Sequence, residues 1–158
     1  MDIFNEQLID FWQKLNDNNV NYIMVGGFAT VFHGFSRTTE DVDLWLEDTL
    51  ENRKNLRKAF IELEQGDFES IETMDFIPGW TTFYGAGIEI DIMTEMKGLE
   101  NISFDECLKL ASIADIEGVK IPFLHINHLI ENKKAINRPK DKIDVEQLEK
   151  IKKIRDEK

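Results

Sequence analysis

Two aspartates interrupt an otherwise apolar stretch and place the strongest constraint on how this chain can fold. Residues 41–44 read Asp-Val-Asp-Leu within the segment YIMVGGFATVFHGFSRTTEDVDLWLE, which spans residues 22–47. Aspartate is a poor strand former, so two of them in a run that predicts a half-buried strand need a compensating partner. On a strand, side chains two positions apart face the same side about 6.5–7 Å apart. Carboxylates at that separation repel unless a cation lies between them, so the pattern predicts a metal site.

A third carboxylate follows in the segment Ile-Glu-Ile-Asp-Ile at residues 88–92. If this strand lies beside the first, Asp91 completes a cluster of three carboxylates with Asp41 and Asp43. Such a cluster suits a hard divalent ion and can hold two ions about 4 Å apart. Glu89 shares the face of Asp91 and is the lower-ranked candidate ligand. The alternative is that these acids lie on the solvent side of amphipathic strands, and for Glu89 this alternative stays open.

A double glycine precedes the aspartates, between an apolar strand at residues 20–25 and a short apolar helix at residues 28–35. Glycine lets the chain turn sharply and lets a ligand approach the backbone amides, and a following helix offers unpaired N–H groups to a phosphate. Gly26 and Gly27 alone would indicate a tight turn. Together with the paired aspartates they predict a phosphate-binding turn beside a metal site.

The remaining pattern predicts alternating helices and strands without repeats or a domain linker. A first helix capped by Asp2 precedes the strand at 20–25, and the second strand covers residues 41–47. Further elements are expected as a helix at 48–65, a hairpin of strands 80–84 and 88–94, a helix at 104–111, a hairpin of strands 112–115 and 119–123, and helical structure from 127 onward. At 158 residues the chain fits one domain.

Charge is distributed unevenly along the chain. The net charge of −12 argues against a general nucleic-acid binder, because phosphate contacts supply most of that affinity. Residues 133–158 carry a net charge of +4, whereas residues 1–132 carry −16. An acidic body beside a basic segment could accept a metal and a polyphosphate together. The alternative is an ordinary solvated amphipathic helix.

The sequence also predicts a cytoplasmic protein without a membrane partner. The single cysteine, Cys107, excludes an internal disulfide. The first residues lack the basic start and apolar core of a signal peptide, and no apolar run approaches the ~20 residues that cross a bilayer.

The glycine pair, the Asp41-Val42-Asp43-Leu44 segment and the alternating Ile90-Asp91-Ile92 strand resemble the signature of the nucleotidyltransferase superfamily with the DNA polymerase β-like fold. The amino-acid sequence of residues 25–46 resembles that of the small bacterial and archaeal proteins of that superfamily. Within that superfamily, the sequence most resembles the AbiEii-type toxin group and the lincosamide and aminoglycoside nucleotidyltransferases. The basic segment from Lys133 to Asp144 is similar to the same subgroup.

This resemblance implies an α/β (α+β) fold with a mixed β-sheet flanked by helices. It implies a single nucleotidyltransferase domain over residues 1–158, with a helical basic C-terminal segment from about residue 127 to 158. If the functional residues of the family are assigned to the matching positions of this sequence, Asp41, Asp43 and Asp91 would bind Mg²⁺ (or Mn²⁺). Asp91 would also assist deprotonation of an acceptor hydroxyl. Gly26 and Gly27 would hold the triphosphate of the NTP. Gly27 stands where many members have a serine, so a hydroxyl contact to phosphate would be absent.

The roles of the basic residues stay open. Arg37, in the loop before the aspartates, could bind a phosphate bidentately or pair with Glu40 or Asp43 as structural support. Lys133 would contact the triphosphate if the basic segment packs near the glycine turn, and it would otherwise lie on an exposed polar surface. The same two interpretations apply to Arg138, namely contact with the triphosphate or a place on an exposed polar surface. Asp141 is expected to cap the last helix.

The leading hypothesis is an enzyme, a nucleotidyltransferase that moves a nucleoside monophosphate from an NTP to an unknown hydroxyl acceptor. The acceptor could be a small molecule, RNA or protein, and a homodimer or a cognate partner protein could provide part of its binding surface. The alternative is a non-catalytic or partner-controlled member of a toxin–antitoxin or abortive-infection pair. The intact carboxylates argue against a decayed site, and antibiotic modification is a third option.

Overall fold

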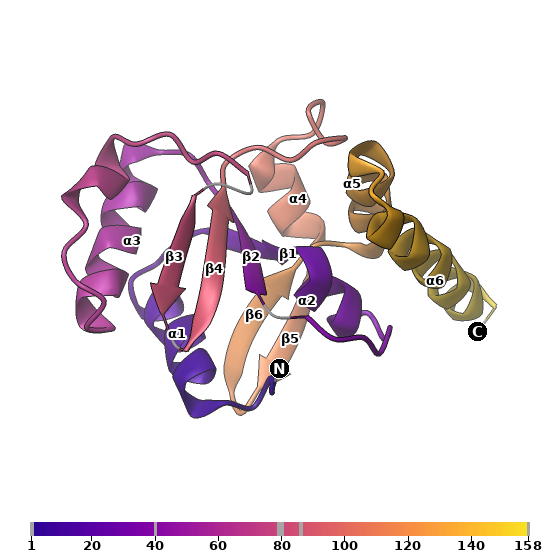
Figure 1. Cartoon of the computed structure of the whole chain (residues 1–158), viewed down its shortest axis with the longest axis horizontal. Coiled ribbons are helices and arrows are strands. Elements are labelled where there is room, and N and C mark those ends of the chain that lie inside the picture. Colours follow the sequence, from indigo (N-terminus) through magenta and orange to yellow (C-terminus); the bar gives the residue numbers. More distant parts are fainter. Residues whose placement is uncertain (1, 40, 79–80, 86, 158) are drawn as a thin grey trace.

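A mixed β-sheet with helices on both sides organises the chain (Figure 1). The computed structural model describes residues 2–39, 41–78, 81–85 and 87–157. Its elements are α1 (Glu6–Asp17), β1 (Tyr22–Val25), α2 (Gly26–Phe32), β2 (Asp41–Leu46), α3 (Leu50–Glu62), the 3₁₀ helix η1 (Glu69–Glu72), β3 (Thr82–Gly85), β4 (Ile88–Met93), α4 (Phe104–Leu110), β5 (Ser112–Ile116), β6 (Val119–Phe123), α5 (Ile126–Ile136) and α6 (Pro139–Asp156).

The strands are ordered β3-β4-β2-β1-β6-β5 within the described residues. The pairs β1–β2, β3–β4 and β5–β6 are antiparallel, whereas β1–β6 and β2–β4 are parallel. The predicted α/β fold with a mixed sheet is therefore confirmed, and so are both predicted hairpins. Trp80 and Ala86, which belong to the first predicted hairpin, lie outside the described residues.

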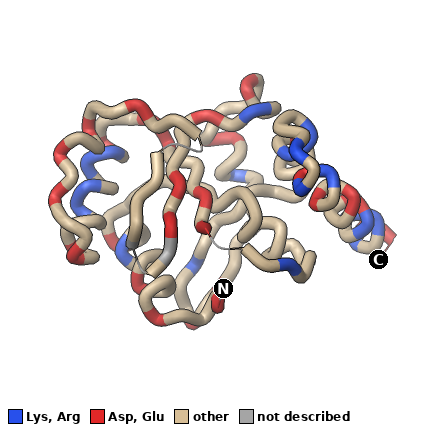
Figure 2. The backbone as a smooth tube through the Cα atoms, viewed as in Figure 1, with Lys and Arg blue, Asp and Glu red and all other residues tan. Residues whose placement is uncertain are grey.

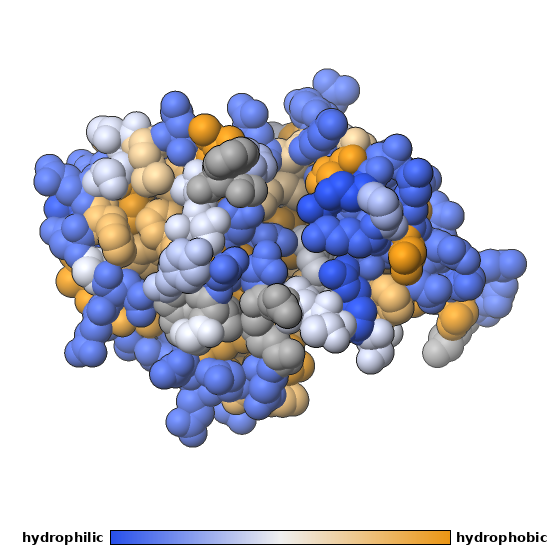
Figure 3. All heavy atoms as spheres, in the orientation of Figure 1, coloured by the Kyte–Doolittle hydropathy of each residue, from blue (hydrophilic) through white to orange (hydrophobic). Residues whose placement is uncertain are grey.

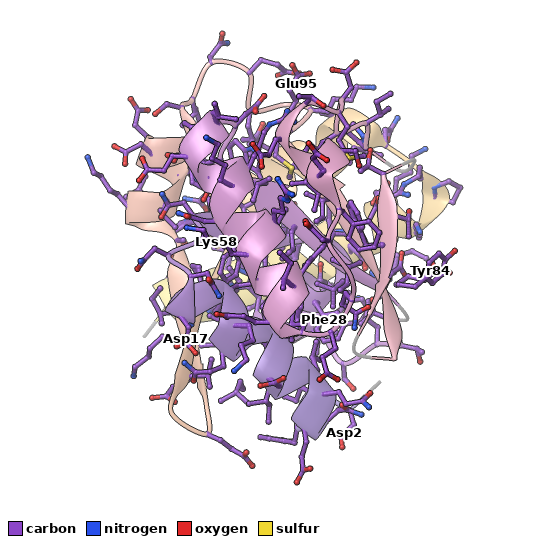
Figure 4. All side chains as sticks on the ribbon, turned by 90° about the vertical axis from the view of Figure 1, so that its left-hand side faces the viewer. Asp2, Asp17, Phe28, Lys58, Tyr84 and Glu95 are labelled. Carbon is purple, nitrogen blue, oxygen red and sulfur yellow. The ribbon has the colours of Figure 1, made fainter. Side chains whose placement is uncertain are left out.

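The two faces of the sheet differ in chemistry. Val42 and Leu44 on β2 are fully buried, as are Ile90 and Ile92 on β4. This face packs on α1 and α3, which lie over it in Figure 4, and the Phe60 ring of α3 contacts the Phe83 ring of β3 at 5.1 Å. Strand alternation turns the intervening carboxylates to the opposite face. The apolar core beneath β2 and β4 thus fixes which way the acidic side chains point.

The C-terminal helices form a hairpin that projects from the body of the molecule (Figure 1). Basic residues are frequent on α5 and α6, while acidic residues occupy β2 and β4 (Figure 2). The two helices are separated at Asn137 and Arg138: Asn137 adopts a left-handed conformation with φ 58°, and Pro139 starts α6. Pro is well suited to the first turn of a helix, where its missing N–H is not needed.

Two predicted helix starts differ from the structure. Asn5, and not Asp2, caps α1, because the Asn5 side chain accepts hydrogen bonds from the backbone N–H groups of Gln7 and Leu8. Helix α2 begins at Gly26, so the glycine pair forms its first turn and not a loop before it. None of the described helices is both long and apolar enough to cross a bilayer.

Candidate active site

Parallel pairing of β2 with β4 gathers the predicted carboxylates. Asp43 lies opposite Asp91 in the register, and Asp41 lies opposite Glu89. Neighbouring strands are about 4.8 Å apart, and directly opposed residues point to the same face. The structure therefore brings the three predicted ligands together and adds Glu89 beside Asp41. Thr82 of β3, which sequence reasoning missed, donates a hydrogen bond to Asp91 Oδ1 at 3.4 Å.

Asp43 lies at the centre of this acidic group. The pKa of its carboxyl group is raised to about 7, mainly by burial and then by the charges of Asp41 and Asp91, while Lys133 and Arg138 oppose the shift. A carboxyl group with such a pKa lacks sufficient compensating charge in the metal-free protein. A cation placed beside Asp43 would supply that charge.

We expect the stability of the metal-free protein to depend on the charge of Asp43. The folded pKa lies above the ordinary value of 3.8, so the folded state holds this proton more tightly than the unfolded chain does. The stabilisation is complete below about pH 4 and is lost as the pH rises through about 7. Between about pH 4 and pH 7 the melting temperature of the wild type should fall more steeply than that of Asp43→Asn, as measured by thermal unfolding in chelator. Parallel curves for the two proteins would contradict this assignment.

The donor set fits a hard divalent cation by its chemistry, because every candidate ligand is a carboxylate oxygen. In their present arrangement, however, no three His, Cys, Asp or Glu side chains among the described residues are grouped so that they could hold one ion. Carboxylates without a cation repel one another, so binding of an ion would require the three side chains to move closer.

The double glycine makes room for the carboxylates. Gly26 has φ +70°, and a Cβ atom there would overlap Asp43 Oδ2 and lie 2.9 Å from Asp43 Cγ. At Gly27 a Cβ atom would lie 2.8 Å from Thr39 Oγ1 and 3.3 Å from Arg37 Nη2. The two glycines therefore allow close approach by side chains of the site itself, in addition to their predicted role beside a phosphate.

Gly26→Ala should lower the free energy of unfolding by about 2–4 kcal/mol. A left-handed conformation costs a non-glycine residue about 1–2 kcal/mol, and the clash with Asp43 adds an overpacking cost. Gly118→Ala is the matched control, because Gly118 has φ +87° with nothing within 4 Å of the added Cβ atom. Urea unfolding of both variants separates the two contributions. Equal losses would show that the contact with Asp43 costs nothing.

Cations from distant parts of the chain meet on one buried carboxylate, Asp144 of α6. Its Oδ2 atom accepts a hydrogen bond from Arg37 Nη1 at 2.5 Å and from Lys133 Nζ at 2.8 Å. Lys133 is only 4% exposed and also lies 3.5 Å from Asp141 Oδ1. Arg37 is therefore paired with Asp144 and not with Asp43, while Glu40, the other structural partner expected from the sequence, lies outside the described residues. Asp144 ties the loop before β2 to the α5–α6 hairpin.

Arg138 and Asp141 begin α6 as a capping pair. The backbone N–H of Arg138 donates to Asp141 Oδ2 at 3.0 Å, and Arg138 Nε donates to the same oxygen at 2.6 Å. The expected cap by Asp141 is therefore present. The Arg138 side chain remains 51% exposed, so it retains access to solvent and to a ligand.

One cavity of about 260 Å³ joins these parts. In Figure 3, hydrophilic residues cover the middle of this face and continue over the side where Figure 1 draws the α5–α6 hairpin. The cavity is lined by all seven residues predicted from the sequence, Gly26, Gly27, Arg37, Asp41, Asp43, Asp91 and Lys133. Six further residues complete the lining, namely Thr39, Thr82, Glu89, Arg138, Lys140 and Asp144. The acids and the cations therefore face a common space.

Comparison with known families agrees with this geometry. A family model described as "Nucleotidyl transferase of unknown function (DUF2204)" matches residues 4–158. The chain belongs to this family. The match to DUF2204 confirms the predicted nucleotidyltransferase superfamily, while the AbiEii-type subgroup stays a prediction. Curated protein sequences gave no match.

Solved structures share the fold of this DUF2204 member at low sequence identity. TM1012 from Thermotoga maritima, a provisionally assigned nucleotidyltransferase, has a TM-score of 0.55 and 19% identity, covering 96% of this chain and 91% of its own. ANT(2")-Ia in complex with adenylyl-2"-tobramycin has a TM-score of 0.56 and 16% identity, covering 92% and 91%. The lincosamide adenylyltransferase LnuA, bound to lincomycin, has a TM-score of 0.53 and 16% identity, covering 87% and 90%.

Proposed function

We propose that this protein transfers a nucleoside monophosphate from an NTP to a hydroxyl group, with Mg²⁺ or Mn²⁺ held by Asp41, Asp43 and Asp91. The observation that supports the proposal is the division of charge within one cavity. Carboxylates of β2 and β4 line this cavity together with Arg37 and Lys133. Nucleotidyl transfer needs both: acids to hold cations at the reacting phosphate, and cations to neutralise the leaving pyrophosphate.

Divalent ions, when bound, supply electrostatic stabilisation of the phosphate and lower the pKa of the attacking hydroxyl. The central position of Asp43, between the charges of Asp41 and Asp91, suits it to share ions with both neighbours. Asp91 pairs in register with Thr82 of β3, on the side of the sheet away from the hairpin helices. This position supports the assignment of Asp91 as the carboxylate that would receive the proton of the acceptor.

The triphosphate is assigned to the space between the glycine turn and the cations. At Gly26 and Gly27 a phosphate meets backbone without a side chain in the way. Arg37 and Lys133 are held in place by Asp144, so their charges are oriented before a nucleotide arrives. Arg138 lines the same cavity with its half-exposed guanidinium. It is suited to the outer phosphates, because its guanidinium reaches solvent while hydrogen bonds to Asp141 hold it at the cavity.

The proposed reaction is an in-line displacement at the α-phosphorus. The acceptor oxygen forms a bond to the α-phosphorus while the bond from that phosphorus to the bridging oxygen breaks. Pyrophosphate leaves with the bonding electrons, and its added charge falls on the side of Arg37 and Lys133. The proton of the acceptor hydroxyl passes to the Asp91 carboxylate and then to water.

A screen of the four NTPs with Mg²⁺ or Mn²⁺ tests this function. Calorimetry should detect metal-dependent binding of at least one NTP, and mass spectrometry should detect an added nucleoside monophosphate on one acceptor class among RNA, protein and small molecules. The small molecules include an aminoglycoside and a lincosamide, because two fold relatives are antibiotic adenylyltransferases. Absence of NTP binding with either metal would refute the proposal. Binding without transfer to any acceptor would favour the non-catalytic, partner-controlled alternative.

A further inference from the structure

We propose that the side-chain hydroxyl of Thr39 binds a phosphate oxygen of the NTP, in the space that a side chain at position 27 would otherwise occupy. This inference rests on the proposed nucleotidyl transfer and adds a binding residue for its phosphate donor. Three observations support it: the position of the hydroxyl beside Gly27, the weak hydrogen bond that it makes within its own loop, and its location next to Arg37 in the cavity of about 260 Å³.

The backbone of Gly27 does not itself require a glycine. Gly27 lies in the first turn of α2 and, unlike Gly26, does not have a positive φ. Glycine weakens a helix because it loses more conformational freedom on folding than any other residue. A side chain is excluded by the surroundings instead: a Cβ atom at position 27 would lie 2.8 Å from Thr39 Oγ1 and 3.2 Å from Thr39 Cβ. The Thr39 side chain therefore fills the space beside the Gly27 backbone.

The hydroxyl of Thr39 changes what the glycine at position 27 implies. A hydroxyl contact to phosphate was expected to be absent, because Gly27 stands where many members of the superfamily have a serine. In the structure a hydroxyl reaches the same part of the site from the segment that joins α2 to β2 (Figure 1). Gly27 and Thr39 thus act as a pair, in which one residue provides the space and the other provides the hydroxyl.

Within the protein the Thr39 hydroxyl makes only a weak hydrogen bond. Thr39 Oγ1 donates to the backbone carbonyl oxygen of Asp41 at 3.4 Å. Hydrogen bonds from hydroxyl groups are usually about 2.5–3.0 Å long, so this bond is easily exchanged. A hydrogen bond to a charged oxygen is shorter and stronger than one to a neutral carbonyl. A phosphate oxygen within reach would therefore take the hydroxyl from the Asp41 carbonyl.

A cation approaches the same point as the hydroxyl. Arg37 Nη2 lies 3.3 Å from the position of a Cβ atom at Gly27. The guanidinium is fixed from its other side, because Arg37 Nη1 donates a hydrogen bond to Asp144 Oδ2 at 2.5 Å. Arg37 and Thr39 both line the cavity that contains the carboxylates. A phosphate beside Gly27 would meet a positive charge and a hydroxyl donor together, and their ion-paired loop presents both before the nucleotide binds.

Thr82 provides the other threonine hydroxyl among the described residues that line this cavity, but it lies beside an acid. Thr82 Oγ1 donates to Asp91 Oδ1 at 3.4 Å. The sheet order places β3, which carries Thr82, beyond β4, whereas α2 follows β1 on the other side of β2. An anionic phosphate is attracted to a cation and repelled by a carboxylate. Thr39, next to Arg37, is therefore the hydroxyl suited to phosphate.

Calorimetry of NTP binding to the full chain, with Mg²⁺ or Mn²⁺, tests this assignment. The ligand is the NTP that the wild type binds most tightly among the four. Thr39→Val keeps the shape of the side chain and removes the hydroxyl, so it should raise the dissociation constant about tenfold, as expected for a lost hydrogen bond to a charged group. Thr39→Ser retains the hydroxyl and should remain within about twofold of the wild type.

Thr38→Val is the matched control, because Thr38 is the exposed neighbour of Thr39 and does not line the cavity. Its affinity for the NTP should equal that of the wild type. Circular dichroism and urea unfolding establish that each variant is folded. Unchanged affinity in Thr39→Val, or an equal loss in Thr38→Val, would overturn the assignment.

Moving the hydroxyl from one position to the other separates phosphate binding from support of the loop. Thr39→Ala alone should weaken NTP binding about tenfold. Adding Gly27→Ser returns a hydroxyl to the same part of the cavity, and the clash with Thr39 Oγ1 is absent in this background. The double variant should therefore recover to within about threefold of the wild type, although it does not restore the bond from Thr39 to the Asp41 carbonyl. Binding no tighter than that of Thr39→Ala would mean that the hydroxyl supports the loop only, and the assignment would be wrong.

The outcomes also separate this inference from the proposed function. If the wild type and Thr39→Val bind the NTP equally well, the assignment of Thr39 is wrong and the nucleotidyltransferase proposal stands. If the wild type binds no NTP with either metal, both proposals fall together.

Discussion

Asp43→Asn should reduce nucleotidyl transfer by about a thousandfold or more while leaving the fold intact. Metal-bound charge stabilisation contributes several kcal/mol to the transition state, and about 4 kcal/mol corresponds to a thousandfold in rate. Asparagine keeps the shape of the side chain but removes the charge that lies between Asp41 and Asp91. In the metal-free protein this change relieves repulsion, so the variant should be at least as stable as the wild type near neutral pH.

The measurement is transfer of labelled nucleoside monophosphate under saturating Mg²⁺, together with calorimetry of NTP binding and circular dichroism of the fold. Asp115→Asn is the matched control: Asp115 lies on β5, pairs with Lys120 at an exposed position, and does not line the cavity. Its activity should equal that of the wild type. Retention of more than a tenth of the activity by Asp43→Asn would remove this carboxylate from the metal site.

Asp144→Asn should lower the free energy of unfolding by about 3 kcal/mol, since removing one partner of a buried ion pair costs about 3–5 kcal/mol. Asp144 is 2% exposed, and its Oδ2 atom accepts hydrogen bonds from both Arg37 and Lys133. In the variant, Lys133 keeps only the longer contact with Asp141, and Arg37 loses its ion-pair partner. The loss should also weaken NTP binding, because the two cations are no longer held toward the cavity.

Urea unfolding at constant salt measures this effect. Asp105→Asn provides the comparison, because Asp105 forms an exposed ion pair with Lys109 on α4 at 2.8 Å. Exposed pairs contribute about 0–1 kcal/mol, so this control should change stability little. Similar small changes in both variants would mean that the contacts of Asp144 do not stabilise the folded state. A large loss of stability with unchanged NTP affinity would make the pairing structural only.

The carboxylate cluster was predictable because it depends on local periodicity. In a strand, alternation alone decides that Asp41 and Asp43 share a face, and the isoleucines around Asp91 decide the same for β4. Which residues stand opposite one another depends on the pairing of two strands far apart in the chain. Glu89 was ranked low for this reason, although the register places it directly opposite Asp41.

The ion pairs of the basic residues were not predictable from local pattern. Arg37 and Asp144 are 107 positions apart, and their contact requires the α5–α6 hairpin to lie beside the loop before β2. The charge asymmetry of the chain indicated that a basic segment could face the acids, but not which acid would receive which cation. The usable signal was the presence of two aspartates, at positions 141 and 144, within residues 133–144, where every other charged residue is basic.

The close approach of Gly26 to Asp43 has a consequence for how such a chain can evolve. Because a Cβ atom at position 26 would overlap the Asp43 carboxylate, position 26 is not free to change while Asp43 is present. A lineage that abandons catalysis and shortens residue 43 also loses the steric reason for glycine at position 26. We therefore expect inactive descendants to change at both positions, and a retained glycine beside a retained aspartate to mark a lineage that still uses the site.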